Sequence, residues 1–510
     1  MTLGLDGDVD AGPDGSHVGG PDFGGERGRS PVGHVVVGLS DVSPERGRSP
    51  VGHVIVGLLV AFHVFVFASY YQWRLTTPTT VLGSDLRAFY TSWRIVIEGH
   101  GSRLYDIGVQ IDAQSRVMGR TMTTESLLAY VNPPFVSLAF VWLGTLRVVV
   151  AYAVFSGLQL LCLFLACRKI LRSQLTHWSP RAQWLFLGSG VLSSATLSAI
   201  TLGTFTPTIL LAMVALGIEF RSALLEGRAP SHWKVGGWIC VLAIKPQLAV
   251  FVVVALLATR QWKSLRSATV LCAALVGASS AVCGIGIWAR YFEILRTYGG
   301  ANGKFGGDSR YMWNVRGLLS RVDGLSLQQA DRISSAMYVV GIVGFGAWVA
   351  RIWSRRSASS AAIDLERIVV LALTLTVLLT PHCNRQDTLL LVPAAVSLIN
   401  VRRACARLAA SELHARAGLA ASELHVSTGL GASEFRAARV DWFSGAACLL
   451  SAVALMWDND PFGYALHPVT VLAAITTVAA WRVRVQHVQH VQHVRNEPGP
   501  VDAAGNLVAL

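Results

Sequence analysis

The sequence predicts an all-α polytopic membrane protein with about twelve transmembrane helices. Of its 510 residues, 52% are hydrophobic and only 14% are charged, whereas soluble domains carry about 25% charged residues. Apolar runs recur along the chain, and Lys and Arg residues gather in short clusters between them. A soluble globule cannot bury so much apolar surface, so lipid is the expected solvent. The same clusters explain the net charge of +13 better than nucleic-acid binding does, because basic residues flank membrane helices on the cytoplasmic side.

The apolar runs define the expected spans, although several are short for a hydrocarbon core about 30 Å thick. The first run begins near residue 51 and is too long for the apolar part of a cleaved signal peptide, so it is expected to be a span. The twelve runs lie at about 51–73, 132–146, 148–167, 182–201, 205–219, 234–259, 265–288, 333–352, 366–380, 388–401, 443–457 and 464–481.

Twelve spans place both ends of the chain on the cytoplasmic side. The basic clusters that then lie inside, as the positive-inside rule requires, are Arg46/Arg48, Arg260/Lys263/Arg266, Arg351/Arg355/Arg356, Arg402/Arg403 and Arg482/Arg484. Two other clusters, within 168–172 and 221–234, would lie outside against the rule. This conflict disappears if one of the four runs between 132 and 219 is re-entrant and the run 234–259 is two half-helices broken at Pro246. Both topologies remain open at this stage.

Five segments are expected along the chain. Residues 1–48, rich in Gly, Asp, Pro and Ser, predict a disordered tail. Residues 49–400 predict the membrane core. A repeat of Ser-Glu-Leu-His type predicts a cytoplasmic insert at 401–440, which precedes a transmembrane hairpin at 441–483. Residues 484–510, which contain three Val-Gln-His copies, predict a second disordered tail.

Two long loops, 74–131 and 289–332, are expected on the extracytoplasmic side in either topology, and loops of this length are usually functional. The first loop carries Asp85 at the start of a helical pattern, with Tyr90 one turn further on. Asp85 is either a helix N-cap, worth about 1 kcal/mol, or a general base at the lipid–water boundary.

Polar residues in apolar runs are further candidates. Lys245 precedes Pro246 in the middle of an apolar stretch, where a cation costs several kcal/mol unless it is paired or hydrated. Such a lysine either binds a phosphate near the headgroups or extends from a helix end to the interface. Asn132 precedes a proline pair that suits a helix start, but the prolines do not explain the asparagine.

A polar turn at 380–387 separates two apolar runs on the side expected for Asp85. It contains His382 and Asp387 together with an arginine, which is more than a turn between two membrane helices needs. Asn314, near the end of the second long loop, is expected on the same side. His382 is therefore either a solvated turn residue or part of a site.

In their order and rough spacing these motifs resemble glycosyltransferase family 87. The motifs are Asp85 followed by Tyr90, Leu104-Tyr-Asp106, Tyr130 with Pro133-Pro134, Lys245-Pro-Gln247, Asn314, and Pro381-His382 with Asp387. The resemblance covers roughly residues 50–400. The chain departs from the family pattern at 202–205, where many members have Gly-Gln, and at Asn314-Val-Arg316, where Asn-Gln-Ser is usual.

That family belongs to the C-type membrane glycosyltransferases and includes actinobacterial α-mannosyltransferases that use polyprenyl-phosphate mannose. The resemblance implies transfer of a hexose, most often mannose, from polyprenyl phosphate to a lipid or glycan hydroxyl at the outer face of a bacterial plasma membrane, with actinobacteria as the expected hosts. It assigns Asp85 as the general base. His382 and Lys245 would hold or neutralise the lipid phosphate, and Asn132, Tyr90 and Asn314 would contact the sugar or the acceptor.

No cofactor and no metal are expected, since no Asp-X-Asp motif of the metal-dependent nucleotide-sugar kind is evident in the predicted membrane core and the eight cysteines of the chain have no metal-ligand spacing. The expected partners are the lipid-linked donor, the acceptor and membrane lipids. The rival function is a transporter or flippase. Transporters often repeat a broken helix in two halves of the chain, whereas this sequence has one Lys-Pro break without a counterpart. An inactive scaffold is a third alternative.

Overall fold

The computed structural model describes residues 71–176, 193–299, 309–357 and 360–405 except residue 402, together with a few isolated positions. All of them belong to one unit of the chain, Ile55–Leu510. The described residues form helices and no strand. The predicted tails at 1–48 and 484–510, the hairpin at 441–483 and nearly all of the insert at 401–440 lie outside the described residues.

Five helical segments among the described residues are long and apolar enough to cross a membrane. They are α6 (Val148–Ser173), α9 (Thr206–Leu225), α12 (Trp262–Cys283), α15 (Leu327–Ser354) and Arg385–Cys405. These segments confirm five of the predicted runs as candidate spans. Large apolar side chains on α12 and α15 remain exposed, such as Val282 at 62% and Val340 at 70%. Such surfaces are suited to lipid contact.

The run 132–146 is not a transmembrane helix, which corrects the prediction of a span there. It forms α5 (Pro134–Ala139) and the short 3₁₀ helix η2 (Val141–Thr145), both packed on α3 (Leu86–Ile97). A Cβ on Gly144 would lie 2.8 Å from the Ile97 side chain, so the chain passes very close to α3 here. The segment therefore belongs with the first loop.

The run 234–259 is two half-helices that reverse direction, as the alternative topology predicted. They are α10 (His232–Leu242) and α11 (Pro246–Ala258). The helices α10 and α12 run in the same direction, because Gly236 lies against Ser267 while Cys240 Sγ lies 3.3 Å from Cys272 Sγ. Only three residues separate α11 from α12, so α11 returns to the end where α10 began. The pair is a re-entrant hairpin, with Lys245 at its tip.

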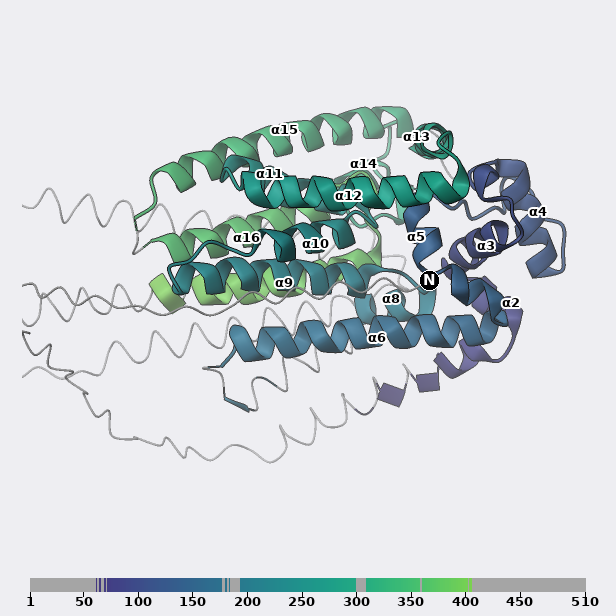
Figure 1. Cartoon of the computed structure of the whole chain (residues 1–510), viewed down its shortest axis with the longest axis horizontal. Helices are drawn as coiled ribbons and strands as arrows, with labels where there is room; N and C mark the ends of the chain where they lie inside the picture. The colour runs from purple at the N-terminus through teal and green to yellow at the C-terminus, as the bar shows by residue number, and fades with distance from the viewer. Residues whose placement is uncertain are drawn as a thin grey trace, which may run out of the picture. The chain divides into compact units, whose positions relative to one another are not determined.

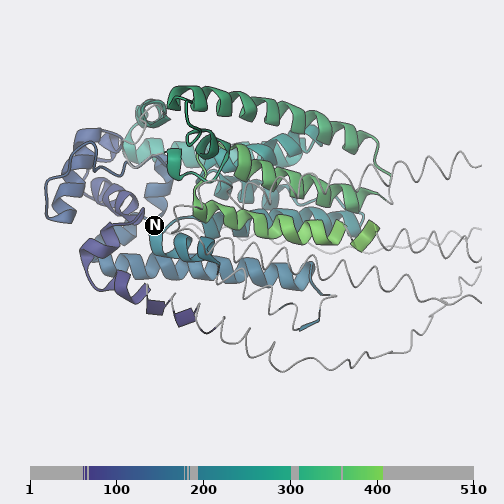
Figure 2. The same cartoon turned by 180° about the vertical axis from the view of Figure 1, so that it is seen from behind.

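The basic clusters beside the described helices share one end of the bundle, which we call the basic end. Figures 1 and 2 show that α6, α9 and α15 finish at this end and that α12 begins there. The residues concerned are Arg168, Lys169, Arg172, Arg221, Arg228, Lys234, Arg260, Lys263, Arg266, Arg351, Arg355 and Arg356. The re-entrant hairpin and the short segment at 132–146 thus remove the conflict with the positive-inside rule.

The first loop folds at the opposite end of the bundle as short helices. They are α2 (Pro78–Leu82), α3 and α4 (Ile107–Met118), and α13 (Ile287–Gly299) lies nearby (Figure 1). Aromatic contacts fix α3 to the bundle: the Phe89 ring packs 5.0 Å from Phe205, directly before α9, and 6.2 Å from Phe155 of α6. Edge-to-face pairs such as Phe89–Phe205 add to the free energy of simple burial.

Gly236 provides a test of the hairpin packing. A Cβ at Gly236 would lie 2.8 Å from the Ala268 backbone nitrogen, whereas nothing lies within 4 Å of one at Gly237. We expect Gly236→Ala to lower the free energy of unfolding by about 1–3 kcal/mol through overpacking. Gly237→Ala should be neutral or raise it by up to about 1 kcal/mol through helix propensity. Thermal unfolding of the detergent-solubilised chain measures both, and equal shifts would contradict the hairpin arrangement.

Candidate functional site

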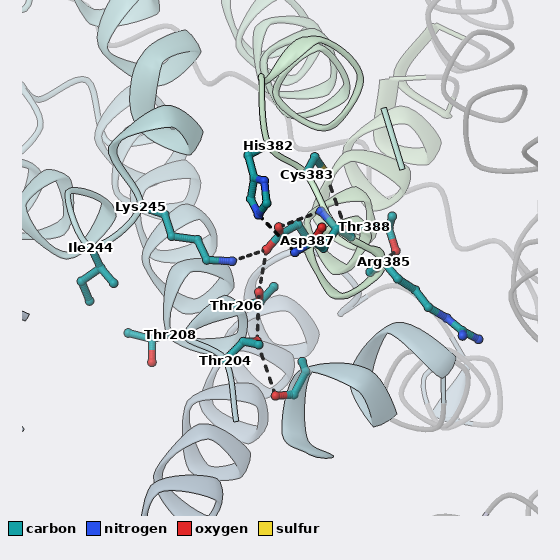
Figure 3. A network of polar contacts seen from close by, with 12 residues as sticks. Thr204, Thr206, Thr208, Ile244, Lys245, His382, Cys383, Arg385, Asp387 and Thr388 are labelled. Atoms are coloured by element: carbon teal, nitrogen blue, oxygen red, sulfur yellow. Dashed lines mark hydrogen bonds and ion pairs between the residues drawn. The ribbon is translucent and has the colours of Figure 1, made fainter. Parts of the chain in front are cut away.

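Lys245 and Asp387 form an ion pair in the interior of the helix bundle. Nζ of Lys245 donates to Oδ1 of Asp387 at 2.7 Å, and the two side chains are only 14% and 1% exposed. Figure 3 shows the lysine extending from the hairpin toward the carboxylate. A single charge at such a position would be very costly, so each ion offsets the desolvation of the other.

The hairpin tip is held by the segment that follows the first loop. Pro246 occupies the first position of α11, where its missing N–H costs no hydrogen bond. Nδ2 of Asn132 donates to the Ile244 carbonyl at 3.0 Å, and the Tyr105 hydroxyl donates to the Asn132 carbonyl at 2.6 Å. These bonds fix the position from which the Lys245 side chain extends.

Both carboxylate oxygens of Asp387 have partners. Oδ1 also accepts from the Thr206 hydroxyl at 2.7 Å, and Oδ2 accepts from the Asn384 N–H at 3.1 Å, where the 3₁₀ helix η4 (Arg385–Leu390) begins. The Thr204 hydroxyl donates in turn to Thr206 at 3.3 Å, a chain visible in Figure 3. The carboxylate thereby joins the start of α9, the polar turn and the hairpin.

Asp85 lies near this pair, directly before α3. Its side chain makes no capping hydrogen bond and its backbone is helical, so the N-cap interpretation is wrong. Burial raises the pKa of Asp85 to about 6, and the positive charge of Lys245 limits the rise. The approach of α8 (Ser194–Leu202) to this point requires a glycine. Gly203 has a φ of +68°, and a Cβ there would lie 3.1 Å from Leu86.

His382 occupies the turn between α16 (Ala361–Leu379) and η4. Burial, reinforced by the charge of Lys245, lowers the pKa of His382 to about 4, so the ring is neutral at neutral pH. Nε2 of His382 accepts a hydrogen bond from the side-chain amide nitrogen Nδ2 of Asn384 at 3.3 Å. This bond places the ring proton on Nδ1. Nδ1 is buried and has no partner among the described residues. The Tyr298 ring packs edge-on at 5.7 Å.

Asn314 braces the same turn from the second loop. It caps α14 (Val315–Leu319), where its Oδ1 accepts from the Gly317 N–H at 2.9 Å, and its Nδ2 donates to the Thr380 carbonyl at 2.5 Å. The neighbouring Trp313 N–H donates to the Cys383 carbonyl at 2.8 Å. Both polar atoms of the Asn314 side chain are thus used by backbone groups.

Arg316, where the sequence departs from the family pattern, supports this brace. Its guanidinium pairs with Asp331 of α15 at 2.6 Å and donates to the Pro381 carbonyl at 3.3 Å. The arginine therefore ties the second loop to the residue that precedes His382.

The structure brings Asp85, Lys245 and His382 close to Asp387, while Asn132 holds the hairpin tip beside Lys245. We call these five residues the lysine site. Tyr90 lies apart, because its hydroxyl donates to the Leu146 carbonyl at 2.8 Å. Sequence reasoning left Asp387 out of the predicted site. A cation in an apolar run needs a counter-ion, and that rule could have identified it.

Thr206 was also missed, and no sequence signal marked it. Among the described residues, no three His, Cys, Asp or Glu side chains are grouped as a metal site requires.

A double substitution tests the ion pair. Asp387→Leu leaves the Lys245 ammonium buried without its carboxylate and should lower the free energy of unfolding by about 3–5 kcal/mol. Adding Lys245→Met should recover most of this loss, since apolar pairs often replace buried ion pairs at little cost. Thermal unfolding in detergent measures the effect. Additive losses in the double variant would show that the two charges are not coupled.

The model of glycosyltransferase family 87 matches residues 130–381, about half of the chain. No curated protein and no solved structure matches the chain. The matched region includes Asn132, Lys245 and Asn314; it begins after Asp85 and ends one residue before His382. The resemblance found in the ordered motifs is thereby confirmed, and the chain belongs to glycosyltransferase family 87.

Proposed function

We propose that this membrane glycosyltransferase moves a hexose, in the first instance mannose, from a polyprenyl-phosphate donor to a hydroxyl of a lipid or glycan acceptor. The observation that supports this proposal most directly is a carboxylate of raised pKa, Asp85, near a buried ammonium, Lys245. The reaction needs a base for the acceptor hydroxyl and a positive charge for the departing phosphate. The lysine site supplies both.

In the proposed reaction, the acceptor oxygen attacks the anomeric carbon of the sugar while Asp85 takes the hydroxyl proton. The bond between the anomeric carbon and the phosphate oxygen breaks, and polyprenyl phosphate leaves with the electron pair. Attack from the face opposite the phosphate inverts the anomeric centre. A pKa of about 6 keeps Asp85 ionised at neutral pH and makes it a stronger base than an ordinary aspartate.

Lys245 and His382 serve the phosphate in different ways. The ammonium of Lys245 has three N–H donors, and its one contact among the described residues is with Asp387, so donors remain for phosphate oxygens. His382 is neutral and contributes a hydrogen bond through its unpartnered Nδ1–H rather than a charge. Lys245 is thus the residue that neutralises the leaving group.

Of the three residues predicted to contact the sugar or the acceptor, we keep Asn132 in that role and give Asn314 and Tyr90 other roles. Oδ1 of Asn132 accepts no hydrogen bond from the described residues, and we assign it to a sugar hydroxyl. Asn314 acts through the turn that it braces rather than by touching the sugar. Tyr90 is too far along α3 to share the lysine site and instead lines a cavity with Arg94 and Arg116.

We assign the lysine site to the extracytoplasmic half of a bacterial plasma membrane, because the basic clusters gather at the opposite end of the bundle. A polyprenyl donor keeps its chain in the lipid and presents its phosphate near the headgroups. The actinobacterial type of membrane, which uses polyprenyl-phosphate mannose, is the proposed setting.

The re-entrant hairpin favours a second candidate, a transporter or flippase of a lipid-linked or small polar substrate. Broken helices with ionisable residues near their tips form the binding sites of many transporters. A transporter has no need for a base, however, whereas the first loop holds Asp85 beside the hairpin. We therefore place transport second.

Asp85→Asn tests the transferase directly. The variant should fold and bind donor, yet lose about 10²- to 10⁴-fold in the rate of transfer because the base is gone. The assay uses the full chain in vesicles with polyprenyl-phosphate mannose and envelope glycolipids, and measures mannosylated product. Asp106→Asn is the matched control, since Asp106 is an N-cap in the same loop and asparagine also caps.

Full activity in Asp85→Asn would remove Asp85 from the mechanism. Movement of the labelled donor across the bilayer without product, in the native chain, would support the transporter instead.

The pH dependence provides an independent test. A general base acts only when deprotonated, so a pKa raised to about 6 predicts that kcat/KM falls about tenfold per pH unit below pH 6. His382 does not titrate in this range, because its pKa lies near 4. The acid limb of a pH–rate profile in vesicles measures the midpoint. A midpoint near 4, the ordinary value for aspartate, would contradict the assignment.

A further inference from the structure

A cavity of about 320 Å³ lies at the far end of α3 from Asp85. Its lining comes from α3, α4 and the start of α6, and comprises Tyr90, Arg94, Glu98, Ala113, Arg116, Val117 and Val148. Nine residues separate Asp85 from Arg94, which is about 13 Å along a helix axis. We call this space the α3–α4 cavity, and nothing in the lysine site explains it.

The cavity has an excess of positive charge. One carboxylate serves two guanidinium groups: Glu98 Oε1 accepts from Arg94 at 3.0 Å and Oε2 accepts from Arg116 at 2.8 Å. Arg147 is exposed directly before Val148, at the start of α6. The Glu98 charge therefore balances only one of the two arginines that line the cavity, and Arg147 adds a positive charge next to the lining residue Val148.

Arg116 has unused hydrogen-bonding capacity. A guanidinium carries five N–H donors, and the contact of Arg116 with Glu98 is the one it makes within the described part of the chain. Its side chain is 59% exposed. Arg94 is more constrained, because it donates to Glu98 through two nitrogens and approaches the Gly144 carbonyl at 3.5 Å. Glu98 thus occupies only part of each guanidinium group and leaves donors for a further anion.

The surroundings of the cavity fit the surface of a bilayer. It lies where the first loop meets α6, a candidate span. Exposed apolar side chains lie on α3, on α6 and on η2, which packs against both; they are Ile97, Val150 and Trp142. Tryptophan is enriched at membrane–water interfaces because its ring is apolar and its N–H is polar. A basic cavity with such a rim suits a ligand that is part anion and part lipid.

We propose that the α3–α4 cavity binds the phosphate of an anionic phospholipid headgroup. Arg116 and Arg94 supply charge-assisted hydrogen bonds to the phosphate oxygens, and the apolar rim contacts the lipid that carries it. Bound lipid would fix the first loop, and with it Asp85, against the membrane. The proposal does not depend on the proposed transferase activity.

The test compares binding of fluorescent phosphatidylglycerol and phosphatidylcholine to the full chain in zwitterionic detergent. We expect the native chain to prefer phosphatidylglycerol and Arg116→Gln to bind it about tenfold less tightly, the loss that one charge-assisted hydrogen bond predicts. Glu98→Gln should bind it more tightly, because a repelling carboxylate is removed. Arg103→Gln is the control, since Arg103 pairs with Asp106 in the same loop outside the cavity.

Native affinity in Arg116→Gln, or weaker binding in Glu98→Gln, would overturn the proposal. The opposite signs expected for the two variants distinguish a lost site from general misfolding. Soluble glycerol phosphate that binds as tightly as the lipid would overturn the phospholipid as the ligand.

Discussion

An ammonium and a carboxylate can share the interior of an apolar helix bundle only when they touch and when their other polar atoms are also satisfied. Lys245 and Asp387 meet both conditions because of the segments around them. The Thr206 hydroxyl and the Asn384 N–H donate the remaining hydrogen bonds to the Asp387 carboxylate. The re-entrant hairpin brings the ammonium to it from a segment 142 residues away.

The first and second loops each position one residue of the lysine site. The first loop packs aromatic side chains of α3 into the bundle and so seats Asp85 near the ion pair. The second loop braces the 380–383 turn through Asn314 and Arg316, which fixes His382. One loop thus positions the proposed base and the other the proposed phosphate contact. Arg316 differs from the residue usual in the family, but the turn is still braced, because Arg316 pairs with Asp331 and donates to the Pro381 carbonyl.

The hairpin also decides the topology. A single helix through 234–259 would reverse the side of each span that follows and leave basic clusters at both ends. Two half-helices return the chain to its starting end. The basic clusters beside the described helices therefore share the basic end, as the positive-inside rule requires. The same reversal places the hairpin tip inside the bundle, where the Lys245 side chain reaches Asp387. Topology and the proposed chemistry therefore have one structural cause.

The sequence by itself determined the helical class, the positions of five candidate spans and the identity of Lys245, His382 and Asp85 as candidates. Each follows from short-range physics: an apolar run, or an ionisable residue in or beside the lipid. Only the tertiary structure decided that 132–146 does not span, that 234–259 is two half-helices, that Asp387 pairs with Lys245, that Asn314 is a brace and that Tyr90 lines the α3–α4 cavity. These outcomes depend on which distant segments meet, and a hydrogen-bond partner 66 or 142 residues away leaves no mark in the local pattern.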